Sequence, residues 1–134
     1  MHLNYDCLRD VLIALEKLLE IRTDDSFEFS MLSIESLLQD CDIVGYSLAD
    51  VFYCVYNLEQ AGYIDASILR SGTLVHECVI FDITYSGHMF LRSIHDETVW
   101  SLLKKKFGPA FSASLPVLQQ MAGQMMLSRM NPTA

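Results

Sequence analysis

Hydrophobic residues recur at three- and four-residue steps near the start of the chain, and this spacing predicts a long amphipathic helix over residues 3–21. Asn4 is the expected N-cap, and Asp6 lies in the first turn, where a carboxylate favours the helix dipole. Residues 23–26 are expected to end this helix. The alternation of apolar and polar side chains at residues 27–29 then predicts a short strand.

Two shorter helices separated by a loop follow. The first is predicted to start near Met31 or Leu32 and to run to Cys41, with its apolar side chains on one face. The second begins at Ser47, a favourable N-cap residue, and stops at Gly62. Two helices at this spacing form a helix-turn-helix arrangement. β-branched and aromatic residues then predict a β-hairpin, with two strands around a turn at Ser71-Gly72.

The chain is predicted to return to helix after the hairpin. A short helix is expected over residues 89–94, and a second helix, capped by Asp96, over residues 97–107. Gly108-Pro109 should break that second helix. Four apolar side chains of these helices are expected to pack under the hairpin and against the first helix: Phe90, Leu91, Ile94 and Trp100.

The segment from residue 111 to residue 130 differs in composition, because it contains four methionines and one charged residue. A stripe of apolar side chains at helical spacing runs along it: Leu115, Leu118, Met121, Met125 and Met126. So much apolar surface favours a homodimer formed through this helix, with closure of the core and binding of a partner as alternatives. The expected organisation is a domain at 1–107, an apolar helix at 108–130 and a frayed tail at 131–134.

The predicted order of helix, short strand, helix, helix and hairpin resembles that of the winged-helix domain. Five residues at the end of the third helix fit the pattern common there: Leu58, Ala61, Gly62, Tyr63 and Ile64. The resemblance implies an α+β fold with a winged helix-turn-helix core, a β-hairpin wing and a C-terminal helical extension.

Two further segments resemble an uncharacterised family, a domain of unknown function found mostly in phages and prophages of bacteria. These segments are residues 3–10 and residues 83–91, and the second continues through residues 94–96 to Val99-Trp100. Where that family commonly has Arg, this chain has His95. The resemblance spans residues 1–107 and implies a phage or mobile-element origin. It brings no activity and no site residues.

Composition and charge disfavour several classes of protein, namely nucleic-acid-binding, membrane and secreted proteins. The 134 residues include 17 Asp and Glu against 9 Lys and Arg, a net charge of −8 that disfavours attraction to nucleic acid or anionic lipid. Charges interrupt every apolar run, so no membrane span is expected. The first ten residues include two aspartates where a signal peptide has basic residues. We therefore expect a protein of the bacterial host's cytoplasm, with its four cysteines as buried free thiols.

The chain lacks a recognisable catalytic arrangement. His88 and His95 lie seven residues apart, a poor spacing for a chelate, and no other ligand stands at metal-binding spacing. Phosphate-binding and dinucleotide-binding glycine motifs are absent from the sequence. We expect no catalytic residues, no metal, no cofactor and no enzyme activity.

A DNA-reading helix needs Lys or Arg for phosphates and Arg, Asn or Gln for base edges. The third predicted helix, residues 47–61, has Asn57 and Gln60 but no Lys or Arg. Its polar and aromatic side chains instead suit a protein interface: Asp50, Tyr53, Tyr56, Asn57, Glu59 and Gln60. The favoured function is a phage-associated interaction protein that binds a host or phage protein with a basic surface. One version is an acidic stoichiometric inhibitor of a host nucleic-acid-handling defence complex, where carboxylates occupy a site made for phosphates.

The alternative function is a prophage transcriptional regulator of the winged-helix type that binds DNA. Its phosphate contacts would have to come from a small basic set: Arg70, Lys104, Lys105 and Lys106. The lysine run lies in the last turn of its helix, where cations also favour the helix dipole.

Overall fold

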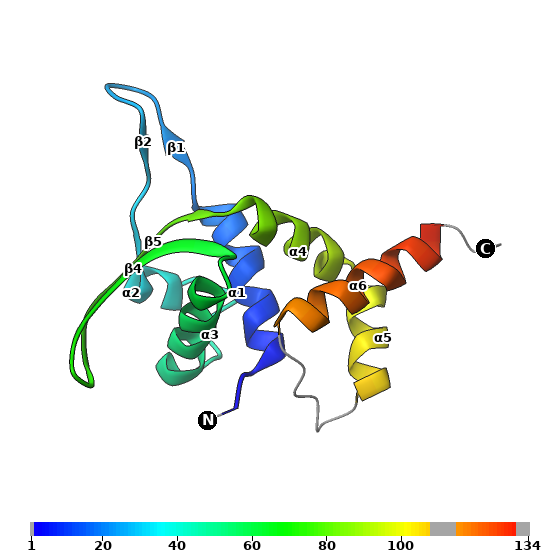
Figure 1. The fold of residues 1–134 in the computed structure, drawn as a ribbon. Coiled ribbons are helices and arrows are strands. Elements are labelled where there is room, and N and C mark those ends of the chain that lie inside the picture. The colour runs from blue at the N-terminus through cyan, green and yellow to red at the C-terminus, as the bar shows by residue number, and fades with distance from the viewer. Residues whose placement is uncertain (1, 108–114, 131–134) are drawn as a thin grey trace.

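The computed structural model describes residues 2–107 and 115–130. Six helices and a small three-stranded antiparallel sheet form the mixed α+β fold of this part of the chain. Figure 1 shows how the helices and strands are arranged. The elements in chain order are α1 (Tyr5–Leu18), β1 (Ile21–Arg22), β2 (Glu28–Phe29), β3 (Leu32–Ser33), α2 (Ile34–Leu38), α3 (Leu48–Gln60), β4 (Ile64–Ser71), β5 (Leu74–Ile83), α4 (Tyr85–His95), α5 (Glu97–Phe107) and α6 (Leu115–Met130).

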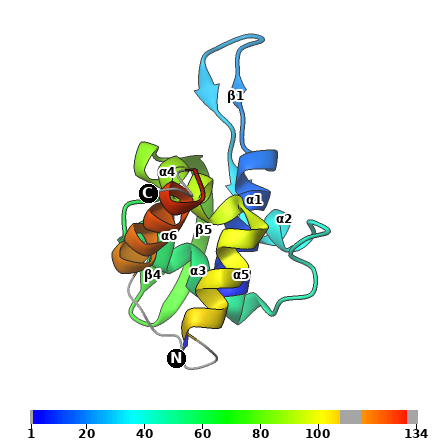
Figure 2. The same cartoon turned by 90° about the vertical axis from the view of Figure 1, so that its right-hand side faces the viewer.

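Helix α1 begins as predicted and ends earlier than predicted. The side chain of Asn4 caps it by accepting a hydrogen bond from the Cys7 backbone N–H at 3.0 Å. The extension of the helix to residue 21 was wrong, because Ile21 pairs with Phe29 in an antiparallel hairpin. This β1–β2 hairpin projects from the body of the molecule in Figure 1 and Figure 2. The strand predicted at residues 27–29 is the second strand of that hairpin.

The three-stranded sheet has the order β3-β5-β4, with both pairs antiparallel. The predicted β-hairpin is confirmed as β4 and β5, which pair from Ile64 with Ile83 down to Ser71 with Leu74. Strand β3 precedes α2, and Ser33 caps that helix by accepting from the Ser36 N–H at 3.2 Å. The predicted start of this helix near Met31 or Leu32 was wrong, because Leu32 and Ser33 pair with β5 as β3, and α2 ends at Leu38, before the predicted end at Cys41.

The core lies where α1, α3, α4 and the sheet meet, and all four predicted side chains Phe90, Leu91, Ile94 and Trp100 are buried in it. The Phe90 ring packs on Tyr63, with ring centroids 5.0 Å apart. Three of the four free cysteines are also buried, whereas the prediction was wrong for Cys41, which is exposed in a loop.

A tight junction joins the sheet to α4. Thr84 accepts a hydrogen bond from the Gly87 N–H at 3.1 Å and donates its own hydroxyl to the Gly62 carbonyl at 2.7 Å. This cap starts α4 at Tyr85, four residues before the predicted start. Gly87 faces the Tyr63 carbonyl so closely that a Cβ at this position would overlap it.

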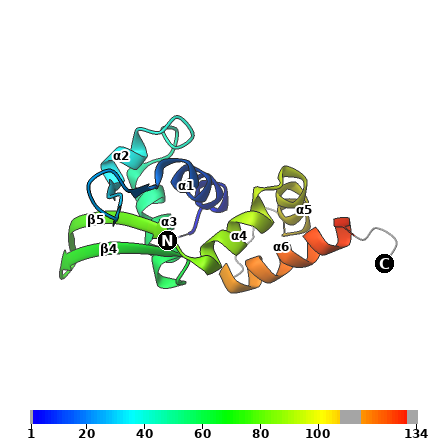
Figure 3. The same cartoon turned by 90° about the horizontal axis from the view of Figure 1, so that it is seen from above.

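Helix α6 packs on α4 and α5, and Figure 3 shows the three helices together at one end of the molecule. Leu115, Leu118 and Ala122 are buried there, and three methionines of the predicted stripe are partly buried against the same core: Met121, Met125 and Met126. The predicted helix break at Gly108-Pro109 and the predicted frayed tail at residues 131–134 lie outside the described residues.

Candidate functional site

Helix α3 presents its polar side away from the core. Ser47 caps it by accepting from the Asp50 N–H at 3.1 Å, and the core side is formed by Val51, Cys54, Val55 and Leu58. All six predicted interface residues belong to this helix and avoid full burial. Gln60 is exposed, and the others are half-buried: Asp50, Tyr53, Tyr56, Asn57 and Glu59.

Several of these side chains are engaged within the helix. The Asn57 amide donates to the Tyr53 carbonyl at 2.8 Å, and the Gln60 amide donates to Glu59 at 3.0 Å. The Tyr56 ring lies 6.3 Å from the Phe52 ring, centroid to centroid. The face is therefore partly ordered before any partner binds, which lowers the entropy cost of binding.

The tyrosines near α3 are not all available for an interface. Tyr63 is buried and donates its hydroxyl to Gln119 at 2.6 Å. Tyr46 is half-buried and donates to Asp10 at 2.6 Å. Burial, and then the neighbouring Asp10 carboxylate, raise the pKa of Tyr46 well above its usual value. These two tyrosines join elements of the fold, which leaves Tyr53 and Tyr56 on the candidate face.

A groove beside α3 was missed by sequence reasoning, because its walls come from three separate segments. It is lined by the start of α2, the start of α3 and one stretch of β5: Ile34, Glu35, Leu48, Ala49, Phe52, Val75, His76, Glu77 and Cys78. Leu48 is 56% exposed and Val75 is 38% exposed, so the groove offers apolar surface to a ligand. No periodicity within one element could have indicated this arrangement.

The charges around this groove are acidic. Glu35 and Glu77 border it, and no Lys or Arg is among its lining residues. Burial, and then the charge of Glu35, raise the pKa of the Cys78 thiol to about 11. The thiol is therefore protonated at neutral pH, which makes it a poor nucleophile and a poor metal ligand.

The basic residues of the DNA-binding alternative do not lie together. Arg70 is exposed near the turn of the β4–β5 hairpin, whereas the lysine run belongs to α5. Figure 1 and Figure 3 place that hairpin turn and α5 at opposite ends of the molecule. Lys104 also forms an ion pair with Asp6 at 2.9 Å. Within one chain, the set Arg70, Lys104, Lys105 and Lys106 does not form a continuous basic surface.

The predicted dimer helix is already covered in part. Leu115 and Leu118 are buried within the chain, so the alternative that α6 closes the core accounts for both. Met121, Met125 and Met126 are partly buried on the same side. The homodimer itself stays a prediction.

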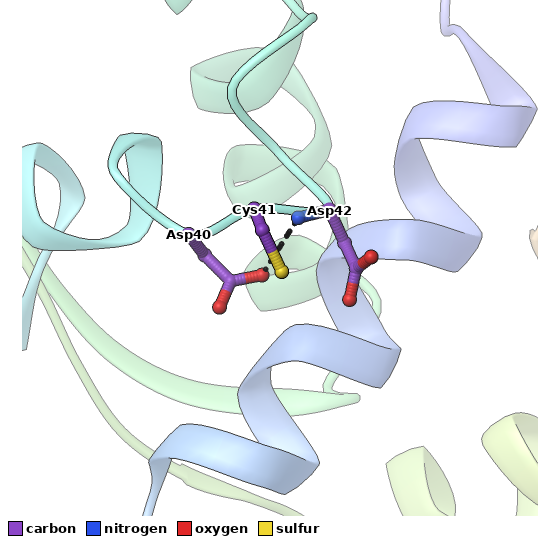
Figure 4. A group of neighbouring side chains, drawn as sticks. All are labelled: Asp40, Cys41 and Asp42. Atoms are coloured by element: carbon purple, nitrogen blue, oxygen red, sulfur yellow. Dashed lines mark hydrogen bonds between the residues drawn. The ribbon is translucent and has the colours of Figure 1, made fainter.

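The two histidines of α4, His88 and His95, are both exposed. His88 and His95 line a shallow groove with Glu16 and Arg92. In the described residues, the three neighbouring groups whose donor atoms lie close enough for a metal are Asp40, Cys41 and Asp42, as Figure 4 shows. Lys17 already pairs with Asp40 at 2.8 Å and with Asp42 at 3.4 Å.

That ion pair, more than any other influence, holds the pKa of Asp40 below its usual value. The Lys17 ammonium therefore offsets part of the negative charge of this loop cluster, in which the Asp40 side chain is only 7% exposed.

Comparison with known proteins gives a family and no activity. The family model described as hypothetical protein (DUF2513) matches residues 2–110. An uncharacterized protein of Haemophilus influenzae is 31% identical over 134 residues, which cover 97% of this chain and 98% of that protein. No solved structure gives a significant match. In the described part of the chain, no helix is long and apolar enough to cross a membrane. The chain belongs to the DUF2513 family.

Proposed function

We propose that this protein is a non-enzymatic binding protein with a winged helix-turn-helix core, and that its α3 face binds a protein partner. The element order α1, β3, α2, α3, β4, β5 supports the winged-helix assignment, with the β1–β2 hairpin inserted after the first helix. The sheet order β3-β5-β4 places the two strands of the proposed wing side by side. In winged-helix proteins, the third helix and the wing commonly form the binding surface.

The charge of that surface supports a protein partner over DNA. Helix α3 has Asp50 and Glu59 and no basic residue, and the β4–β5 hairpin has three acidic residues, Asp65, Glu77 and Asp82, against Arg70. Lys and Arg supply the charge that attracts DNA phosphates, and this surface has only Arg70. An acidic, tyrosine-containing face instead suits a basic protein surface, where charge complementarity speeds association.

A more specific role follows from the resemblance to the phage-associated family. We propose a stoichiometric inhibitor in the cytoplasm of a bacterial host, directed at a protein that handles nucleic acid. Its carboxylates would occupy a site that normally binds phosphates. The observation that supports this role is the net charge of −8, combined with the absence of Lys and Arg from α3.

A DNA-binding experiment tests the proposal directly. We expect no measurable binding of the protein to random-sequence duplex DNA at about 150 mM salt, where non-specific binders have dissociation constants of roughly 10⁻⁴ to 10⁻⁶ M. Asp50→Lys with Glu59→Lys should create weak DNA affinity on the same face. Salt-dependent duplex binding by the unmodified protein that is lost when Lys104, Lys105 and Lys106 are replaced by Ala would support the regulator instead.

The protein partner is tested with the same substitutions. Affinity capture from a host lysate, followed by purification of the recovered protein, gives a defined pair for kinetic measurement. Asp50→Lys with Glu59→Lys should reduce mainly the association rate of that pair, because surface charges steer encounter. An unchanged association rate at low salt would contradict a role for the α3 face.

A further inference from the structure

One edge of β5 is only partly paired. Strand β4 pairs with β5 from Ile83 down to Leu74, whereas β3 pairs on the other edge only with Ile80 and Val79. Among the described residues, no strand covers that second edge at residues 74–78. Unpaired N–H and C=O groups on a strand edge are a template for a further strand.

The open edge lies beside the apolar groove. Val75, His76, Glu77 and Cys78 contribute to one wall of the groove, and the first turns of α2 and α3 form the other. The groove therefore begins where β3 ends and the chain turns into α2. Backbone groups that can pair and apolar side chains that can be covered are thus side by side on one surface.

A β-bulge limits what can pair there. The register between β4 and β5 passes from Leu69–Glu77 to Arg70–Val75, which leaves His76 without an opposite residue. The His76 ring lies 2.9 Å from the Ser71 hydroxyl, which ties the bulge to β4. A bulge increases local twist and disfavours long flat pairing, so a short added strand fits this edge better than a long one.

The acidic residues around the groove favour a basic added strand. Glu35 and Glu77 border the groove, while no Lys or Arg lines it. Another copy of this chain also has an acidic surface, because the net charge is −8. A basic segment is therefore complementary in charge, and a second copy is not.

We propose that the groove binds a short, extended, basic segment of a partner protein as an additional strand along residues 74–78 of β5. In strand addition, main-chain hydrogen bonds provide affinity and alternate side chains provide specificity. Apolar side chains of the segment pack on Leu48 and Phe52, and its Lys or Arg side chains approach Glu35 and Glu77. The inference rests on the proposed function, and it adds the chemistry of the partner and its mode of binding.

A synthetic heptapeptide of alternating Lys and Val is the probe. Two controls are the same peptide with alternate backbone nitrogens methylated, and a heptapeptide of alternating Glu and Val. Backbone amide resonances of the full chain are followed by NMR during titration. We expect shifts at residues 74–78 and in the first turn of α3 with the basic peptide. Methylation should weaken binding about tenfold, because it removes hydrogen bonds and adds clashes at the edge, and the acidic peptide should give no shifts.

Substitutions in the groove provide the second arm. Leu48→Gln with Val75→Gln should weaken the basic peptide about tenfold. The matched control is Leu69→Gln, since Leu69 is 55% exposed on the neighbouring strand β4 and lies outside both the groove and residues 74–78. Glu35→Gln with Glu77→Gln should reduce both affinity and its dependence on salt. The thermal midpoint of each variant is measured to show that it folds.

Several outcomes would overturn the inference. Equal binding of the methylated peptide would exclude strand addition, and the absence of shifts at saturating peptide would exclude the site. If the amide resonances of residues 74–78 shift with protein concentration in the absence of peptide, this edge of β5 pairs with a second copy of the chain. If the peptide shifts only Tyr53 and Tyr56, and Asp50→Lys abolishes these shifts, the groove is not the binding site. The proposed function of the α3 face would then remain in place. Duplex binding with no peptide binding would overturn both.

Discussion

The indole nitrogen of Trp100 donates a hydrogen bond to Asp6 across 2.9 Å and thereby joins α5 to α1. Lys104 donates to both oxygens of the same carboxylate, at 3.0 and 2.9 Å. Arg9 lies with its guanidinium 5.9 Å from the centroid of the Trp100 ring and donates to the carbonyls of Ile94 and His95, each at 2.8 Å. Two of the chain's few basic residues therefore connect helices instead of facing a ligand.

The Asp6 carboxylate should make stability depend on pH. Partial burial works to raise its pKa, but hydrogen bonds from Trp100 and Lys104 outweigh burial and hold the pKa below the ordinary value of 3.8. A lowered pKa stabilises the fold above the ordinary value, and this stabilisation is lost as pH falls through the folded-state pKa. We expect the difference in unfolding free energy between the native chain and Asp6→Asn to shrink as pH falls below about 4.

Denaturant titrations at a series of pH values measure that difference. Lys104→Ala should reproduce part of the effect, because Lys104 contributes to the lowered pKa of Asp6. Lys105→Ala is the matched control and should leave the pH dependence unchanged. A constant difference between the native chain and Asp6→Asn across this range would contradict the assignment.

Trp100 should be important for stability because its ring is buried at 6% exposure. Trp100→Ala should reduce the unfolding free energy by roughly 3–5 kcal/mol through lost packing. Trp100→Phe keeps most of the apolar volume and removes the donor to Asp6, so it should cost about 1–3 kcal/mol. Thermal and urea unfolding check both values, and a nearly unchanged midpoint for Trp100→Ala would place the indole outside the core.

Replacement of two glycines by alanine should change the unfolding free energy in opposite directions. Gly87→Ala introduces a Cβ that overlaps the Tyr63 carbonyl and the Ile83 side chain, and the backbone must move by an amount that costs about 1–3 kcal/mol. Gly123 lies inside α6 with nothing near its Cβ position. Gly123→Ala should therefore raise the unfolding free energy by about 0.5–1 kcal/mol through helix propensity. Equal effects at both positions would contradict the close approach at Gly87.

Two phenylalanines with opposite burial form another matched pair. Phe90 is fully buried, and Phe90→Ala should cost about 3–5 kcal/mol. Phe27 is 90% exposed in the β1–β2 hairpin, and Phe27→Ala should change stability by less than about 0.5 kcal/mol. Urea unfolding of the two variants tests this contrast. A large loss for Phe27→Ala would show that the hairpin packs against another surface in solution.

Helix α6 offers a test of core closure against dimerisation. Leu118 is fully buried and Leu127 is 63% exposed on the same helix. Leu118→Ala should cost about 2–5 kcal/mol at any protein concentration, while Leu127→Ala should stay within about 0.5 kcal/mol. Unfolding at several concentrations, together with light scattering, separates the two possibilities. A midpoint that rises with concentration and falls with Leu127→Ala would instead show that α6 stabilises a dimer.

Much of the fold could be predicted from local patterns. Asn4 and Ser47 cap α1 and α3 as expected, because a short polar side chain before an apolar stripe satisfies free backbone N–H groups. The β4–β5 hairpin followed from its β-branched residues and turn glycine, and Gly72 indeed has a positive φ of 59°. The candidate residues of α3 could be assigned to one helix for the same reason, because they lie in one short segment, and their role in binding stays a prediction.

Features that depend on pairing between distant segments could not be predicted in this way. Ile21 has helical spacing in the sequence but belongs to a strand, because pairing with Phe29 outweighs weak helix propensity at a helix end. The two-residue strand β3 exists only through its pairing with β5. The groove beside α3 combines side chains from residues 34 to 78, and local periodicity contains no information on such separations.

The sequence by itself determined the α+β class, most helix positions and the acidic character of α3, because these depend on composition and on spacing within short segments. The resemblance of residues 3–10 and 83–91 to an uncharacterised family agrees with the DUF2513 match. The tertiary structure decided that α6 buries Leu118 within the chain, that Lys104 binds Asp6, and that the lysine helix lies far from the β4–β5 turn. It also decided which edge of β5 stays open. These properties follow from long-range packing, in which each side chain's environment is set by residues far away in the chain.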